Sequence, residues 1–263
     1  WKVVTSAADG MAHMGTVVQD TTHYRHDHEV TITAVPNNGY EFVKWSDETG
    51  GAKRSFIITR DTSFQAIFRP SLYNVAVTAN EPTWGTVKGN GYYDYLTERT
   101  ITAEANYGYV FDHWEDGLAL TVDSAHFKEK SRRFILEGDT AFKAIFVRDT
   151  FEISTAADKD FMGSVSGGGR YAYQTSTSLM ATPTYGYEFS KWDDNYPYPS
   201  RTISVTRDAL FTAVFKLKPM QITVATDDSN MGTVEGGGWY DYNSVCIVKA
   251  VPKYGYEFVM WKE

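Results

Sequence analysis

Three histidines near the start of the chain, His23, His26 and His28, form the first group of side chains that could do chemistry. Imidazole nitrogens are common metal ligands, and spacings of three and two residues on a strand could bring two of them to one ion. Similar sequence recurs further along the chain, and there the position of His26 is held by Tyr95, Tyr173 and Tyr242. A flat polar ring in every copy indicates packing near the surface of a strand, so we expect no metal ligands and no cofactor.

Acidic pairs form the second group, at Asp47-Glu48, Glu115-Asp116 and Asp193-Asp194, each just after a tryptophan. A hydrolase that uses paired carboxylates needs one pair held in a cleft, whereas here the pair is repeated. The repetition indicates a polar loop or a weak Ca²⁺ site. The sequence also lacks a Gly-x-Ser-x-Gly motif, a Cys/His dyad and a phosphate-binding loop. We therefore predict no catalytic residues and a protein that is not an enzyme.

The composition limits the kinds of molecule that the chain is expected to bind. A net charge of −8 makes nucleic acid an improbable partner, because no basic face is evident to neutralise phosphates. No apolar run approaches the roughly 20 residues that cross a bilayer as a helix, so we expect no transmembrane segment. The lone cysteine, Cys246, cannot form an internal disulfide or a four-thiolate zinc site. The chain begins at Trp1 rather than Met, from which we expect a piece of a longer protein linked to further domains.

The elements that would position any site are themselves repeated. Three anchors recur in one order: a Gly-Thr/Ser-Val step, a Gly-Tyr step that opens a heptapeptide ending in Trp, and an Ala-Ile/Val-Phe step. The glycines of the second anchor, which lie 69, 78 and 69 residues apart, are Gly39, Gly108, Gly186 and Gly255. A period of about 69 residues exceeds that of solenoid repeats and approaches the size at which a unit buries its own core. We therefore predict separate modules in tandem.

The spacing of the anchors sets the expected module boundaries. The four modules are residues 1–70, 71–148, 149–217 and 218–263. The second module carries about nine extra residues, which we place in a loop insertion at 115–133. The fourth lacks the third anchor, so it should expose a sheet edge or borrow a strand from elsewhere.

Each module has the pattern of an all-β unit. Short alternating runs such as Val30–Pro36, rich in Val, Ile and Thr, are separated by turn residues, and no long stretch has helical spacing with caps. We predict about six strands in each module and little or no helix. Strict alternation would turn Trp45 to the opposite face from Tyr40 and Phe42, so a bulge or bend is expected within the heptapeptide.

The repeated aromatic residues of the heptapeptide are predicted to form the core of each module. One fully buried large side chain contributes about 1.5–3 kcal/mol, which explains why every copy keeps them. The predicted core residues are Tyr40, Phe42, Trp45, Tyr109, Phe111, Trp114, Tyr187, Phe189, Trp192, Tyr256, Phe258 and Trp261.

These motifs together resemble the divergent InlB B-repeat and the related Listeria–Bacteroides repeat of bacterial surface proteins. The resemblance covers essentially the whole chain and is clearest in the third and fourth copies. It implies small β-grasp-like modules and an extracellular or cell-surface location in bacteria. It also implies a spacer, adhesion or scaffold role without catalytic residues, so we expect a stalk within a larger surface or secreted protein.

Aromatic residues that depart from the repeat are the candidates for contact with a protein or glycan at a surface. They are Trp84, Tyr92, Trp239, Phe127, Tyr196 and Tyr198. Two alternatives to a passive stalk remain open, one suggested by these aromatic residues and one by the repeated modules. One is a carbohydrate- or glycoprotein-binding module that stacks sugar rings on aromatic faces, and the other is a structural protein of a virion or appendage.

Overall fold

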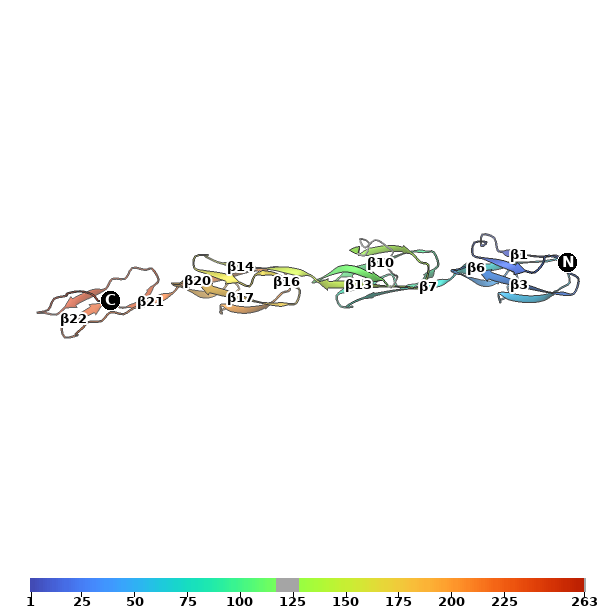
Figure 1. The fold of residues 1–263 in the computed structure, drawn as a ribbon. Helices are drawn as coiled ribbons and strands as arrows, with labels where there is room; N and C mark the ends of the chain where they lie inside the picture. Colours follow the sequence, from blue (N-terminus) through green and yellow to red (C-terminus); the bar gives the residue numbers. More distant parts are fainter. Residues whose placement is uncertain (117–127, 263) are drawn as a thin grey trace. The chain divides into compact units, whose positions relative to one another are not determined.

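The computed structural model describes residues 1–116 and 128–262, and the chain divides into two compact units, Trp1–Val147 and Arg148–Glu263. Each unit contains two of the expected modules, which we call the first to fourth module with the boundaries given above. The described residues form β-strands and turns without an α-helix (Figure 1). None of them belongs to a helix of a length and apolarity that could span a membrane.

The first module contains six strands, arranged as two sheets. They are β1 (Val3–Ala7), β2 (Gly15–Gln19), β3 (His28–Pro36), β4 (Tyr40–Trp45), β5 (Lys53–Ile58) and β6 (Thr62–Pro70). One sheet has the order β1-β6-β4 and the other β2-β3-β5. The closing strand β6 lies in the middle of its sheet, parallel to β1 and antiparallel to β4, so it holds that sheet together.

The second and third modules repeat this arrangement and each add one short strand. The second contains β7 (Leu72–Ala79), β8 (Gly85–Lys88), β9 (Gly91–Asp94), β10 (Glu98–Ala105), β11 (Tyr109–Asp116), β12 (Ser131–Ile135) and β13 (Thr140–Arg148). The third contains β14 (Thr150–Ala157), β15 (Gly163–Ser166), β16 (Gly169–Ala172), β17 (Ser176–Pro183), β18 (Tyr187–Trp192), β19 (Ser200–Ser204) and β20 (Ala209–Leu217). The added strands, β9 and β16, contain Tyr93 and Tyr171 and extend the sheet of the closing strand at its edge. In the first module an isolated bridge between Lys2 and His23 takes their place.

Each of the first three modules has its own hydrophobic core between its two sheets. Trp45, Trp114 and Trp192 are the largest buried side chains, each at most 1% exposed, and one lies in each core. The half-buried rings of Phe42, Phe111, Phe189 and Tyr187 pack against the same cores, and Tyr40 and Tyr109 are also half buried. An all-β fold of tandem modules of about 70 residues is thus confirmed, while the β-grasp-like detail and the module boundaries stay predictions.

The expected bulge in the heptapeptide is confirmed. The pairing of β4 with β6 shifts register between Phe42 and Lys44, and that of β18 with β20 shifts between Phe189 and Lys191. One extra residue in the strand reverses the alternation. Phe42 and Trp45 can therefore both point into one core, with their ring centroids 5.4 Å apart.

The fourth module differs from the first three, and its predicted core is not assembled among the described residues. It contains β21 (Pro219–Ile222), β22 (Gly232–Glu235), β23 (Gly238–Asp241) and β24 (Lys249–Pro252), which form two sheets of two strands. The predicted core residues Tyr256, Phe258 and Trp261 are 51%, 46% and 42% exposed. Residues 218–262 contain no counterpart of β19 and β20, so nothing covers these rings in the described structure.

Candidate contact surfaces and module joints

The joint between the first and second modules is built on one glycine and one tyrosine. Gly39 has a φ of +81°, and a Cβ added to it would collide with the ring of Tyr95. The backbone completes the joint, because the Ser71 N–H donates to the Gly39 carbonyl at 2.9 Å and the Tyr95 N–H donates to the Ser71 carbonyl at 3.0 Å. Tyr40 and Tyr73 pack edge-on against Tyr95, with ring centroids 5.4 and 6.0 Å away.

The joint between the third and fourth modules has the same construction. Gly186, with a φ of +88°, lies against the ring of Tyr242 and leaves no room for a Cβ. The Lys218 N–H donates to the Gly186 carbonyl at 3.0 Å, and the Tyr242 N–H donates to the Lys218 carbonyl at 3.2 Å. Tyr187 packs on Tyr242 at 5.8 Å between ring centroids. Two joints from separate units therefore use one design.

Tyr93 and Tyr95, two residues apart in the second module, have different roles: the first ring packs against a core and the second lies in a joint. Tyr93 packs against the core of the second module, donates its hydroxyl to the Asn90 carbonyl at 2.9 Å, and lies under the Arg99 guanidinium at 4.1 Å. Tyr95, two residues on, lies in the joint. Residues two apart on an extended chain point to the same side, so their spacing places the two rings on one face but does not reveal that the second ring contacts another module.

The three histidines considered as metal ligands are exposed, and each has a different partner. His26 lies 2.9 Å from the exposed Asp27 carboxylate, His28 stacks on Tyr24 at 5.7 Å, and His23 shares a 3.0 Å hydrogen bond with Thr22. Within the described residues no group of three His, Cys, Asp or Glu side chains is arranged to hold a metal ion.

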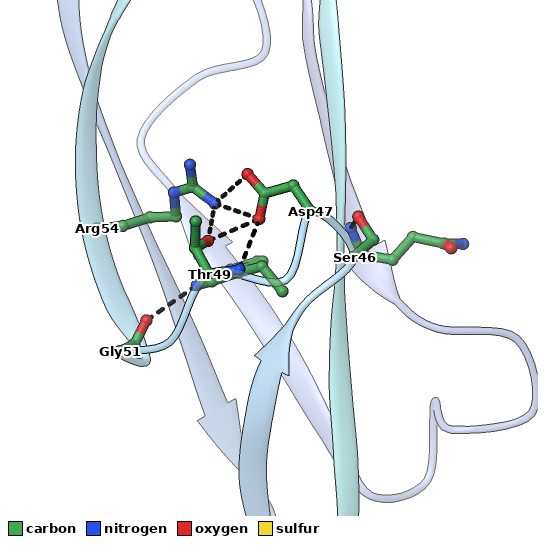
Figure 2. Close-up of polar contacts among 7 residues, drawn as sticks. Ser46, Asp47, Thr49, Gly51 and Arg54 are labelled. Atoms are coloured by element: carbon green, nitrogen blue, oxygen red, sulfur yellow. Dashed lines mark hydrogen bonds and ion pairs between the residues drawn. The ribbon is translucent and has the colours of Figure 1, made fainter.

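The acidic residue after the repeated tryptophan binds an arginine. The Arg54 guanidinium donates to both carboxylate oxygens of Asp47, at 2.9 and 2.8 Å, and Thr49 donates its hydroxyl to the same carboxylate at 2.6 Å (Figure 2). Burial raises the pKa of Asp47, but hydrogen bonds from Thr49 and Arg54 outweigh it and hold the pKa below its ordinary value. A carboxylate neutralised by arginine is poorly suited to bind Ca²⁺.

The third module repeats this ion pair. Arg201 donates to Asp194 at 2.7 Å, and its guanidinium lies over the rings of Tyr196 and Phe211 at 4.7 and 4.9 Å. In the first module the corresponding arginine, Arg54, lies over Phe64 at 4.4 Å. Each pair thus fastens the loop after the tryptophan to the aromatic edge of the core. Tyr196 is half buried in this arrangement, and its ring packs against the core of the third module.

The remaining candidate contact residues fall into two groups. Tyr92, Trp239 and Tyr198 are 70%, 67% and 65% exposed. Trp84, which was expected to be exposed, is instead half buried and stacks on Tyr109 with centroids 4.8 Å apart. Phe127 and most of the predicted insertion 115–133 lie outside the described residues.

Separate cores, a repeated loop clamp and a repeated joint define the chain as a tandem all-β repeat protein. A family model of the divergent InlB B-repeat domain matches residues 4–71, 73–150, 153–219 and 222–263, and the chain belongs to this family. The resemblance seen in the sequence is thereby confirmed. The family is a repeat domain of bacterial surface-type proteins.

Two further comparisons add little. Among solved structures, the Bacillus anthracis TIE protein is similar over 94% of this chain and 59% of that chain, with 8% sequence identity and a TM-score of 0.33. The chain thus spans less than two thirds of the length of that chain. No curated protein matches the chain.

Proposed function

We propose that this chain is a non-catalytic spacer or adhesion stalk within a larger bacterial surface or secreted protein, located outside the cell and linked to further domains. The observation that supports this role most directly is the joint, because the Gly39–Tyr95 and Gly186–Tyr242 contacts restrict how one module turns on the next. A spacer needs such joints, since flexible connections would let its two ends come together.

The independent cores support the same role. Each of the first three modules buries its own tryptophan, so adding a module adds length without rebuilding the ones already present. The clamps made by Arg54 and Arg201 use carboxylates for structure rather than for chemistry.

A distance measurement within the first unit tests the spacer role. Spin labels would be attached to cysteines replacing the exposed Asp9 and Glu81, in a background in which Cys246 is replaced by Ser. These two positions lie in equivalent turns of neighbouring modules. A spacer predicts one narrow distance distribution by double electron–electron resonance. A broad distribution, like that of a flexible linker, would contradict the proposal.

Carbohydrate binding is the second candidate, and one observation favours it. Tyr92 on β9 and Trp239 on β23 occupy equivalent positions and are exposed by 70% and 67%, so each presents a flat ring to solvent. Such faces can stack on sugar rings. Titration with polysaccharides should give saturable binding that weakens in Tyr92→Ala and Trp239→Ala. Tyr254→Ala, which removes an exposed ring elsewhere, is the control.

A further inference from the structure

We infer that each of the first three modules is built to bear tension, because its opening and closing strands form a mechanical clamp. A spacer has only to keep two ends apart, so this function goes beyond the proposed role and does not depend on stiff joints. The observation that carries it is the parallel pairing of the opening strand with the closing strand, which recurs as β1–β6, β7–β13 and β14–β20.

The third module shows how a pull along the chain would load this pair of strands (Figure 1). β14 opens the module, β20 closes it, and five residue pairs join them in parallel, from Ile153–Ala209 to Ala157–Ala213. In a parallel pair, the beginning of one strand and the end of the other lie at opposite ends. Tension that enters at Thr150 and leaves at Leu217 therefore slides the strands past each other, and the hydrogen bonds between them carry the load together.

The second module is loaded in the same way. Its β7 pairs with β13 in parallel over five residue pairs, from Val75–Thr140 to Ala79–Ala144. Only Ser71 separates β7 from the preceding β6, and only Asp149 separates β13 from the following β14. A pull transmitted along the chain therefore passes directly from the closing strand of one module to the opening strand of the next, without a slack linker between them.

The closing strand cannot slide without breaking contacts on its other side. β20 is also paired with β18, in the antiparallel direction, and its inward side chains Ala213 and Phe215 are 0% and 4% exposed. The ring of Phe215 lies against Gly163 in the opposite sheet. A slip of one residue would turn this ring outward, and a slip of two residues would move it by about 7 Å. Packing of the ring therefore opposes the same movement as the hydrogen bonds do.

An aspartate extends the clamp at the end where tension enters. The Asp208 carboxylate accepts a hydrogen bond from the Glu152 N–H at 2.7 Å, one residue beyond the ladder of paired residues. The other two modules repeat this contact, at 2.8 Å from the Asn74 N–H to Asp139 and at 2.7 Å from the Lys2 N–H to Asp61. The aspartate of the turn before the closing strand thus holds the opening strand in all three modules.

A second set of contacts extends the clamp at the end where tension leaves. The Asp158 N–H donates to the Ala213 carbonyl at 2.9 Å, and the Asp158 carboxylate accepts the Phe215 N–H at 3.1 Å. In the second module Asn80 makes the same two contacts, with the Ala144 carbonyl at 2.9 Å and the Phe146 N–H at 3.0 Å. These contacts add to the hydrogen bonds that a pull along the chain must break together.

The test is single-molecule force spectroscopy on the whole chain, with Cys246 replaced by Ser and handles on two engineered cysteines at exposed positions. Thr150→Cys with Lys218→Cys pulls the parallel pair in shear, whereas Thr150→Cys with Arg207→Cys peels it apart from one end. Each pull releases roughly 200 Å of extended chain, which identifies the event as unfolding of the third module. We expect the mean unfolding force in shear to be at least about twice the peeling force, because the bonds break together. Equal forces in two chains of equal stability to urea would overturn the inference.

Variants of the contact at the far end of the pair show whether the clamp carries the load. Asp158→Ala should lower the unfolding force in shear but leave the peeling force unchanged, because peeling from Thr150 reaches this contact last. Asp160→Ala, at an exposed position in the same turn, is the control and should change neither force. A loss of equal size in both directions, or no loss in shear, would contradict the place of Asp158 in the clamp.

Discussion

The ring of Phe68 packs directly on the backbone of Gly15, and a Cβ on this glycine would come within 2.6 Å of the ring. The contact ties the closing strand of the module, β6, to its second strand, β2, which belongs to the opposite sheet. The equivalent pairs Gly85–Phe146 and Gly163–Phe215 have the same relationship. One small residue facing one large residue thus sets how closely the two sheets approach in each complete module.

Gly85→Ala should therefore destabilise the second module by about 1–3 kcal/mol, because the added methyl group overpacks the space filled by Phe146. Gly138→Ala in the same module is the control, since a Cβ there meets nothing within 4 Å. Urea unfolding with hydrogen exchange resolved by peptide would measure both variants. Equal loss of stability in the two would contradict the close fit between Gly85 and Phe146.

Gly39→Ala should loosen the joint while leaving the core of the first module folded. The methyl group would displace the Tyr95 ring, so the distance distribution between labels at positions 9 and 81 should broaden. Gly51→Ala is a matched control because Gly51 also has a positive φ, of +90°, but has only the Lys53 carbonyl, at 3.6 Å, near the added Cβ. If Gly51→Ala broadens the distribution equally, backbone strain rather than the ring contact governs the joint.

The Asp47–Arg54 pair should make stability depend on pH in the acid range. The pKa of Asp47 lies below its ordinary value of 3.8 in the folded chain, so the folded state favours the ionised carboxylate. The stabilisation is present above pH 3.8 and is lost as pH falls through the lower, folded-state pKa.

Asp47→Asn should remove this acid-sensitive part of the stability, at a cost of about 0.5 kcal/mol at neutral pH, since the carboxylate is partly exposed. Thermal unfolding between pH 2.5 and 7 would measure it, with Asp9→Asn at an exposed position as the control. An unchanged pH profile in Asp47→Asn would show that the pair contributes nothing to stability.

Two tryptophan substitutions should have opposite outcomes. Trp192→Ala should cost about 3–5 kcal/mol and unfold the third module at moderate urea concentrations, because this side chain is fully buried. Trp239→Ala should change stability by less than about 0.5 kcal/mol, because this side chain is 67% exposed. Chemical denaturation monitored by circular dichroism would compare them. A large loss in Trp239→Ala would mean that this ring packs against something in solution.

Local patterns in the sequence predicted the interior of the first three modules well. The recurrence of Trp45 at the end of the heptapeptide, out of step with Phe42, was enough to predict the bulge, because alternation in a strand is a local property. The same reasoning placed Trp114 and Trp192 in cores.

Contacts between distant residues could not be predicted in this way. Gly39 is recognisable as a turn glycine, but its contact with Tyr95 depends on how two modules meet. Trp84 departs from the repeat and was expected to be exposed, yet Tyr109 covers one of its faces. Trp261 has the sequence surroundings of a core residue, yet it is 42% exposed, and the described residues include no strand equivalent to β20 that could cover it.

Because each joint is shared between two modules, its construction affects how such proteins can gain modules during evolution. Every module that carries a glycine like Gly39 at one end and a tyrosine like Tyr95 at the other holds both halves of a connection. Duplication of the corresponding gene segment therefore copies a compatible pair of ends at once. Longer forms can arise by recombination between repeats without a new interface having to evolve.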